Sequence, residues 1–282
     1  MLARRLLLAA PSLLLGAADR PAPSWPSTDQ PATTQPATDR VPGGRMPLAA
    51  TPLSRMETPW WRARHEEKLQ EIKGRPVDLV WLGDSITQNW ERRGPPDWMD
   101  FAPAWERFYG RRRAVNLGFK GDNTGHLLWR MQNGELDGIQ PRAAVVLIGA
   151  NNMGRVRWSA PQTLAGIGAV LQELHRRLPG TKALLIGVLP SLRSKWVTRT
   201  TDEVNAGLAA RYGNGAAPGV TYADLGALFM RDGQVDRRAF YDDLLEPPDP
   251  PLHPSVAVQT RMAESIEPVL AAMLGDRNRI RQ

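Results

Sequence analysis

A short apolar run that stops at a Gly-Asp-Ser turn constrains this chain more than any other feature. Residues 77–82 (VDLVWL) are mostly apolar and β-prone, and Gly83-Asp84-Ser85 follows directly. A run of this length that is bounded by a turn signal predicts a buried strand. Ser85 then begins a helix at the carboxyl end of that strand, where open α/β sheets bind their ligands. Backbone N–H groups and the positive end of the helix dipole lie beside such a hydroxyl, and they stabilise negative charge.

Strand and helix patterns alternate through the rest of the chain. Strands are predicted at 77–82, 113–117, 143–149, 182–188 and 219–224. Helices are predicted at 60–73, 84–91, 124–134, 160–177, 199–212 and 255–274. The insert 92–112 carries Trp98, Phe101, Trp105 and Phe108 and is expected to pack as a helix over the sheet. Strands separated by helices imply right-handed crossovers and a parallel sheet that is covered on both faces.

Three later positions carry residues that suit the chemistry of a nucleophilic serine. Gly121 lies in the turn after the second predicted strand, and Asn151 lies in the turn after the third. His253 lies just before the last helical pattern. Ester hydrolysis by a serine needs a base for the hydroxyl and hydrogen-bond donors for the oxyanion, and these residue types supply them.

The order of Ser85, Gly121, Asn151 and His253 resembles that of the SGNH (GDSL-type) hydrolases. The segments GDSITQNW, NLGFKGDNTGHLLWRMQNGEL and VVLIGANN are most similar to one branch of that family. This branch contains the catalytic subunits of platelet-activating-factor acetylhydrolase and related bacterial acetylesterases. The resemblance covers about residues 77–273 and implies an α/β, flavodoxin-like three-layer sandwich with a five-stranded parallel sheet.

The resemblance also implies a role for each of these residues. Ser85 is the nucleophile, and His253 is the general base and then the general acid. The backbone N–H groups of Ser85 and Gly121 and the side-chain amide of Asn151 form the oxyanion hole. No cofactor and no metal site are expected, since no His pair stands at ligand spacing.

The acid that should orient the histidine departs from the family pattern. An Asp-x-x-His signature would place it at position 250, which is Pro250. We expect Asp249, one residue further away, to reach the imidazole of His253 through a bulged loop. The other candidates are a backbone carbonyl and three nearby acids, Asp242, Asp243 and Glu246.

The remaining histidines, tryptophans and Asp84 are given structural roles. His65, His126 and His175 are expected on helix surfaces, and Asp84 is expected to hold its turn by side-chain hydrogen bonds. Five tryptophans are expected to fill core and loop contacts rather than to stack on sugars: Trp90, Trp98, Trp129, Trp158 and Trp196.

The N-terminal part of the chain has the pattern of an export signal and a linker. Arg4 and Arg5 precede a short apolar stretch and small residues, which predicts a signal peptide at 1–18. Residues 19–56 are rich in Pro, Ser, Thr and Ala, and we interpret them as a disordered linker. The hydrolase domain is then expected at 57–276, followed by a basic tail at 277–282.

Charge and cysteine usage exclude several function classes. The formal charge of +7 falls to +5 without Arg4 and Arg5 (34 basic against 29 acidic residues). The arginines are scattered and nothing resembles a nucleic-acid module, so we expect a solvated surface and no nucleic-acid partner. The absence of cysteine excludes disulfides, thiolate catalysis and a lipid anchor on an N-terminal Cys.

Together these features predict an exported serine esterase, secreted or periplasmic, that hydrolyses short-chain esters of an alcohol or carbohydrate, acetyl esters above all. Two enzymatic alternatives are a lysophospholipase or thioesterase and an acyltransferase. A third alternative, motivated by the displaced acid, is a non-catalytic polysaccharide-binding protein on the same fold. No stable membrane insertion is expected, and a homodimer is an option that the resembling branch suggests.

Overall fold

A five-stranded parallel sheet forms the centre of the protein. The computed structural model describes residues 46–280, so the predicted signal peptide and most of the predicted linker lie outside the described residues. The strands are β1 (Leu79–Gly83), β2 (Ala114–Gly118), β3 (Ala143–Leu147), β4 (Lys182–Ile186) and β5 (Val220–Ala223). They are hydrogen-bonded in the order β2-β1-β3-β4-β5, which confirms the predicted fold class.

The side chains of each central strand divide between two apolar cores. On β1, Val80 and Leu82 belong to one core, whereas Leu79 and Trp81 belong to the other. All four are essentially inaccessible to solvent. A parallel sheet buried on both faces needs such continuous apolar runs, and this is why the strands could be located from the sequence.

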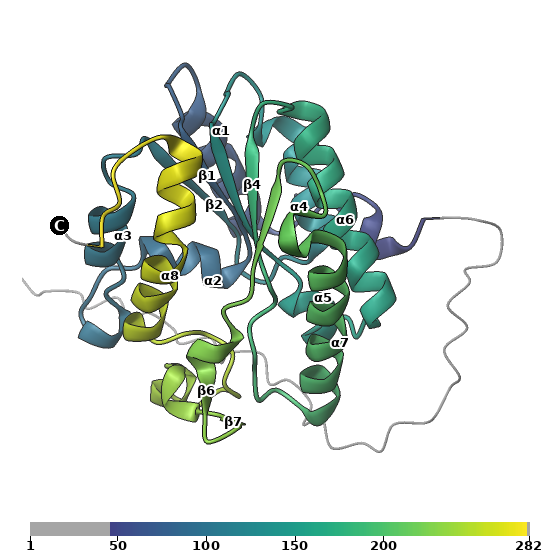
Figure 1. Ribbon diagram of the computed structural model, residues 1–282, viewed down its shortest axis with the longest axis vertical. Coiled ribbons are helices and arrows are strands. Elements are labelled where there is room, and N and C mark those ends of the chain that lie inside the picture. Colours follow the sequence, from purple (N-terminus) through teal and green to yellow (C-terminus); the bar gives the residue numbers. More distant parts are fainter. Residues whose placement is uncertain (1–45, 281–282) are drawn as a thin grey trace, which may run out of the picture. The chain divides into compact units, whose positions relative to one another are not determined.

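Helices cover both faces of the sheet, which gives three layers (Figure 1). One face carries α4 (Thr124–Arg130), α6 (Ala160–Arg177) and α7 (Lys195–Tyr212). The other carries α3 (Ala102–Phe108) and α8 (Val256–Leu274). The remaining helices are α1 (Pro59–Ile72) and two short ones that follow strands directly, α2 (Ser85–Gln88) and α5 (Ala150–Gly154). None of the helices within residues 46–280 is long and apolar enough to cross a membrane.

The insert between β1 and β2 packs as predicted. Phe101 and Phe108, at the two ends of α3, are fully buried against the core that α8 shares. A small hairpin that was not predicted follows β5; its strands are β6 (Met230–Arg231) and β7 (Gln234–Val235).

The packed part of the chain begins before the predicted domain start at residue 57. A short 3-10 turn, Leu48–Ala50, lies against α4 and α6. The Thr124 hydroxyl donates to the carbonyl of Ala49 over 2.6 Å, and the N–H of Leu53 donates to the carbonyl of Gly125 over 2.9 Å. The last part of the predicted linker is therefore a packed segment, because its backbone supplies partners to α4.

The described C-terminal residues also extend beyond the predicted domain end at 276. The N–H of Arg279 donates to Glu267 of α8 over 2.7 Å. Glu267 is fully buried and also pairs with Arg112 over 2.7 Å. Part of the predicted basic tail is thus fixed to the domain by a buried carboxylate.

Candidate active site

The nucleophile candidate stands on a helix that lies directly on two strands. A Cβ atom on Gly83 would collide with Oγ1 of Thr87 in α2, and one on Gly118 would collide with the backbone nitrogen of Gln88 in the same helix. Only glycine at the ends of β1 and β2 leaves room for α2 to approach this closely. Asp84 then caps α2, since its carboxylate accepts the N–H of Ile86 over 3.0 Å, as the predicted structural role requires.

Three side chains form a continuous hydrogen-bonded chain at the carboxyl edge of the sheet. The Oγ of Ser85 lies 3.0 Å from Nε2 of His253. On the other side of the ring, Nδ1 of His253 lies 2.6 Å from Oδ1 of Asp242, whose side chain is fully buried. The ring of Tyr241 stacks on the imidazole with centroids 5.5 Å apart. A serine, a histidine and a buried carboxylate in this order have the geometry of a catalytic triad.

The prediction that Asp249 orients the histidine is wrong, because Asp242 occupies that place. The second oxygen of Asp242 accepts the backbone N–H groups of Leu252 (2.8 Å) and His253 (2.6 Å). The backbone N–H of Asp249 in turn donates to the carbonyl of Asp242 over 3.2 Å. The loop therefore folds around Asp242, while the side chain of Asp249 is exposed.

Pairing between distant parts of the loop brings Asp242 to the histidine. An isolated antiparallel bridge joins Phe240 to Pro254, and the N–H of Tyr241 donates to the carbonyl of His253 over 3.1 Å. The next acid, Asp243, points elsewhere and pairs with Arg237. Asp242 lies 11 positions before His253, so the motif spacing in the sequence could not identify it.

The structure brings the predicted oxyanion-hole residues Gly121 and Asn151 together. The side-chain amide of Asn151 donates to the carbonyl of Asp122 over 2.9 Å, directly after Gly121. Gly121 has a φ of +78°, which favours glycine. Within residues 46–280, the N–H groups of Ser85 and Gly121 and the second N–H of the Asn151 amide have no hydrogen-bond acceptor. These are the groups that an oxyanion would need.

The buried carboxylate of Asp122 holds the Gly121 turn in place. Asp122 accepts Nε of Arg130 over 2.8 Å, Nε1 of Trp61 over 2.8 Å and a guanidinium nitrogen of Arg55 over 3.0 Å. The carboxylate is fully buried and fully engaged, so it fixes the turn between β2 and α4.

Arg130 links this turn to both neighbouring strands. Its guanidinium also donates to the carbonyls of Gly83 (3.2 Å) and Leu117 (3.1 Å) and pairs with buried Glu135. The sequence analysis missed this role. It also wrongly placed His65 on the surface, where the structure instead buries it 3.3 Å from Glu135. Charged residues in helices are usually exposed, and only their partners make such burial tolerable.

Burial shifts the pKa of two groups near the site. It raises the pKa of Asp84 to about 7, an effect to which the charge of Asp122 adds. Desolvation lowers the pKa of half-buried His126 to about 4. The neutral ring of His126 accepts the N–H of Asn123 over 3.2 Å and so completes a capping box at the start of α4.

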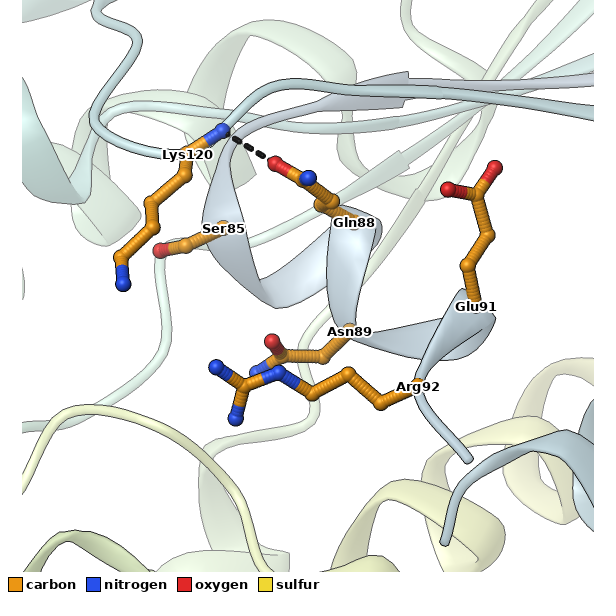
Figure 2. Close-up of a pocket in the computed structure, with 6 residues that line it drawn as sticks. All are labelled: Ser85, Gln88, Asn89, Glu91, Arg92 and Lys120. Atoms are coloured by element: carbon orange, nitrogen blue, oxygen red, sulfur yellow. Dashed lines mark hydrogen bonds between the residues drawn. The ribbon is translucent and has the colours of Figure 1, made fainter. Parts of the chain in front are cut away.

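A small polar cavity opens beside Ser85 (Figure 2). Its volume is about 210 Å³. The residues that line it are Ser85, Gln88, Asn89, Glu91, Arg92 and Lys120.

Comparison with known proteins agrees with this geometry. Residues 81–261 match the model of the GDSL-like lipase/acylhydrolase family. The chain belongs to this family. This GDSL acylhydrolase is therefore an enzyme that hydrolyses ester bonds, and the resemblance stated from the sequence is confirmed.

A named relative supports the same assignment, and solved structures share the fold. The chain is 31% identical over 191 residues to platelet-activating factor acetylhydrolase IB subunit alpha1 of Bos taurus, which covers 65% of this chain and 74% of that one. A GDSL-like lipase from Bacteroides thetaiotaomicron shares the fold with a TM-score of 0.55 at 15% identity, over 74% of this chain and 97% of that one. A carbohydrate esterase family 3 protein from Talaromyces cellulolyticus does so with a TM-score of 0.52 at 14% identity, over 71% and 99%.

Proposed function

We propose that this GDSL acylhydrolase is an exported serine esterase that removes short acyl groups, acetyl above all, from an alcohol or carbohydrate. One observation carries the proposal. Ser85 lies within hydrogen-bond distance of His253, and His253 lies within hydrogen-bond distance of a buried carboxylate, that of Asp242. A serine hydroxyl becomes a useful nucleophile only with such an oriented base beside it.

The reaction follows from the contacts of these three side chains. Nε2 of His253 takes the Ser85 proton as Oγ attacks the acyl carbon, and Asp242 holds the proton on Nδ1 and stabilises the imidazolium. The imidazolium then protonates the leaving alcohol, which departs and leaves an acyl-enzyme on Ser85. Water, deprotonated by the same imidazole, releases the acid and restores the serine.

The oxyanion formed in each half of the reaction needs donors that are already in place. We assign this role to the N–H groups of Ser85 and Gly121 and to the amide of Asn151. Within the described residues, the two backbone N–H groups and the second N–H of the Asn151 amide have no other acceptor, which supports the assignment. The contacts by which Asp122 holds the Gly121 turn support it as well. Donors held in position before the reaction lower the barrier without reorganisation.

The size and lining of the cavity favour a short acyl group over a long one. A cavity of about 210 Å³ whose lining residues are all polar or charged offers no apolar side chain to a long acyl chain. A lysophospholipase or long-chain thioesterase would need an apolar surface. The name of the acetylhydrolase relative also favours acetyl.

The observation that favoured a non-catalytic binding protein no longer holds. It rested on the displacement of the acid from position 250, and Asp242 supplies a carboxylate to His253 without that position. Export rests on the signal pattern at 1–18. Mass spectrometry of the mature N-terminus tests it: a chain that begins near residue 19 supports cleavage, and an intact Met1 after fractionation contradicts it.

Hydrolysis of p-nitrophenyl esters of increasing chain length tests the proposal. We expect kcat/KM to be highest for the acetate and to fall for the octanoate and laurate, and Ser85→Ala to lose turnover. Ser265→Ala is a matched control, because Ser265 is an exposed serine of α8 whose hydroxyl only donates to Arg261. Activity that survives in Ser85→Ala, or that rises steadily with chain length, would contradict the proposal.

A further inference from the structure

Two cations extend into the cavity on the side of the Ser85 hydroxyl. In Figure 2 the side chains of Lys120 and Arg92 both extend toward Ser85, whereas Glu91 points away from it. Lys120 comes from the turn after β2 and Arg92 from the segment after α2, so two separate parts of the chain place positive charge beside the nucleophile.

Two acceptors that line the cavity, those of Glu91 and Gln88, are already engaged. Glu91 pairs with Arg64 over 2.8 Å and with Lys68 over 2.5 Å. The side-chain oxygen of Gln88 accepts the backbone N–H of Lys120 over 2.7 Å. The cavity therefore presents donors to a ligand, and a ligand rich in acceptors matches it.

The cations have no close counter-charge within the protein. Among residues 46–280, no carboxylate lies within salt-bridge distance of Lys120 or Arg92. The guanidinium of Arg92 donates to the hydroxyl of Tyr241 over 2.9 Å. This bond uses one of the five N–H groups of the guanidinium.

The cations of the cavity act on one another through their charges. Partial desolvation, together with the charges of Arg92 and Arg155, lowers the pKa of Lys120. The charge of exposed Asp249 opposes this shift in the pKa. Mutual repulsion of this kind is relieved when an anion binds between the cations.

We propose that the natural substrate carries an anionic group, a carboxylate or a phosphate, that Lys120 and Arg92 bind beside the scissile ester. This inference rests on the proposed esterase function and narrows its substrate to anionic esters. The two cations hold the anion while Ser85 attacks the neighbouring acyl carbon, so they raise kcat/KM for the anionic ester over a neutral one.

Lys120 is the better residue for a test. Its backbone is fixed by Gln88 and by Arg55, which donates to the Lys120 carbonyl over 3.1 Å, so a change of side chain leaves the turn in place. Arg92, in contrast, also contacts Tyr241, which stacks on His253, and its loss would disturb the base.

The experiment compares two acetyl esters that differ in one charge, 4-acetoxybenzoate and methyl 4-acetoxybenzoate, with rates corrected for spontaneous hydrolysis. We expect the full-length enzyme to prefer the anionic ester, and Lys120→Gln to lower the ratio of the two kcat/KM values by about tenfold, the loss of one charge-assisted hydrogen bond. Added salt should lower the same ratio, because these charges are partly exposed. Arg211→Gln, which removes an exposed cation from the last turn of α7, is the matched control and should leave the ratio unchanged.

Inhibition distinguishes the two anion classes. Inorganic phosphate that inhibits hydrolysis of the methyl ester competitively, and more strongly than benzoate does, indicates a phosphate-bearing substrate; the reverse order indicates a carboxylate. Both inhibitions should weaken in Lys120→Gln.

The outcomes separate this inference from the proposed function. If the methyl ester is hydrolysed in a Ser85-dependent way but the anionic ester is no better and Lys120→Gln leaves the ratio unchanged, the inference is wrong and the esterase function stands. If Ser85-dependent hydrolysis of both esters is absent, the proposed function fails and the inference fails with it.

Discussion

The two halves of the candidate site are built in different ways. Ser85, Gly121 and Asn151 follow the ends of β1, β2 and β3, and all three are buried against the sheet. His253 and Asp242 lie instead outside the sheet, and the residues that follow the buried acid are mostly exposed. The strand-end half is fixed by close backbone contacts, whereas the loop half is fixed mainly by the hydrogen bonds of one carboxylate. In a site of this kind the strand ends hold the nucleophile in place, whichever position of the loop supplies the acid.

The largest expected effect concerns the loop half, where Asp242 and Asp249 can be compared directly. Asp242→Asn should lower kcat for p-nitrophenyl acetate by about 10⁴-fold, since the histidine loses the partner that fixes its tautomer. Asp249→Asn should change kcat little, because its side chain does not contact the imidazole. Thermal melting of both variants checks that the loop remains folded. Equal losses in the two variants would contradict the assignment of Asp242.

A smaller effect is expected from the strand-end half. Asn151→Ala should lower kcat by about 10²–10³-fold, the usual result of removing one oxyanion donor. KM should change little, because this donor acts mainly on the charge that forms in the transition state. Steady-state kinetics with p-nitrophenyl acetate measures both constants. A variant that raises KM and leaves kcat intact would show that Asn151 binds the ground state instead.

The smallest expected effect tests the cost of burying a carboxylate beneath the nucleophile. The native pKa of Asp84 is about 7 and its ordinary value is 3.8, so the native state binds more protons than the unfolded chain between these limits. Asp84 therefore lowers the free energy of unfolding as pH rises from about 4 to 7. Asp84→Asn keeps an oxygen for the N–H of Ile86 and should remove this slope.

Urea unfolding of both proteins at pH 5 and pH 8 measures the slope. The native sequence should lose more stability than Asp84→Asn between these two values. The same loss in both proteins would show that Asp84 is charged without cost in the folded state.

The sequence predicted the strand-end half of the site well for a physical reason. Buried parallel strands have continuous apolar runs, and the residues that follow them must lie at one edge of the sheet. Ser85, Gly121 and Asn151 could therefore be placed together from local patterns and the family resemblance. Of the helices, α6 spans Ala160–Arg177, the predicted range, whereas α7 begins at Lys195 instead of residue 199 and the short α5 was not predicted.

The residues that the sequence did not predict, or gave only as an alternative as it did Asp242, depend on contacts between distant segments. Asp242 reaches His253 only because Phe240 pairs with Pro254, and no local spacing encodes that bridge. Arg130 and His65 are buried because partners from other elements satisfy them, which a helical pattern alone cannot reveal. The sequence feature nearest to a signal for the acid of the triad was the adjacent pair Asp242 and Asp243, and its spacing from His253 matches no motif.

The segment before the first helix has a consequence for any attempt to transplant this domain. Thr124 and Gly125, just beyond the Gly121 turn, bond to Ala49 and Leu53. A graft or shortened chain that started at residue 57 would leave the buried Thr124 hydroxyl without its acceptor, three residues from a candidate oxyanion donor. The smallest part of the chain that can carry the site into another protein therefore begins at the packed segment Leu48–Ala50, about ten residues before α1.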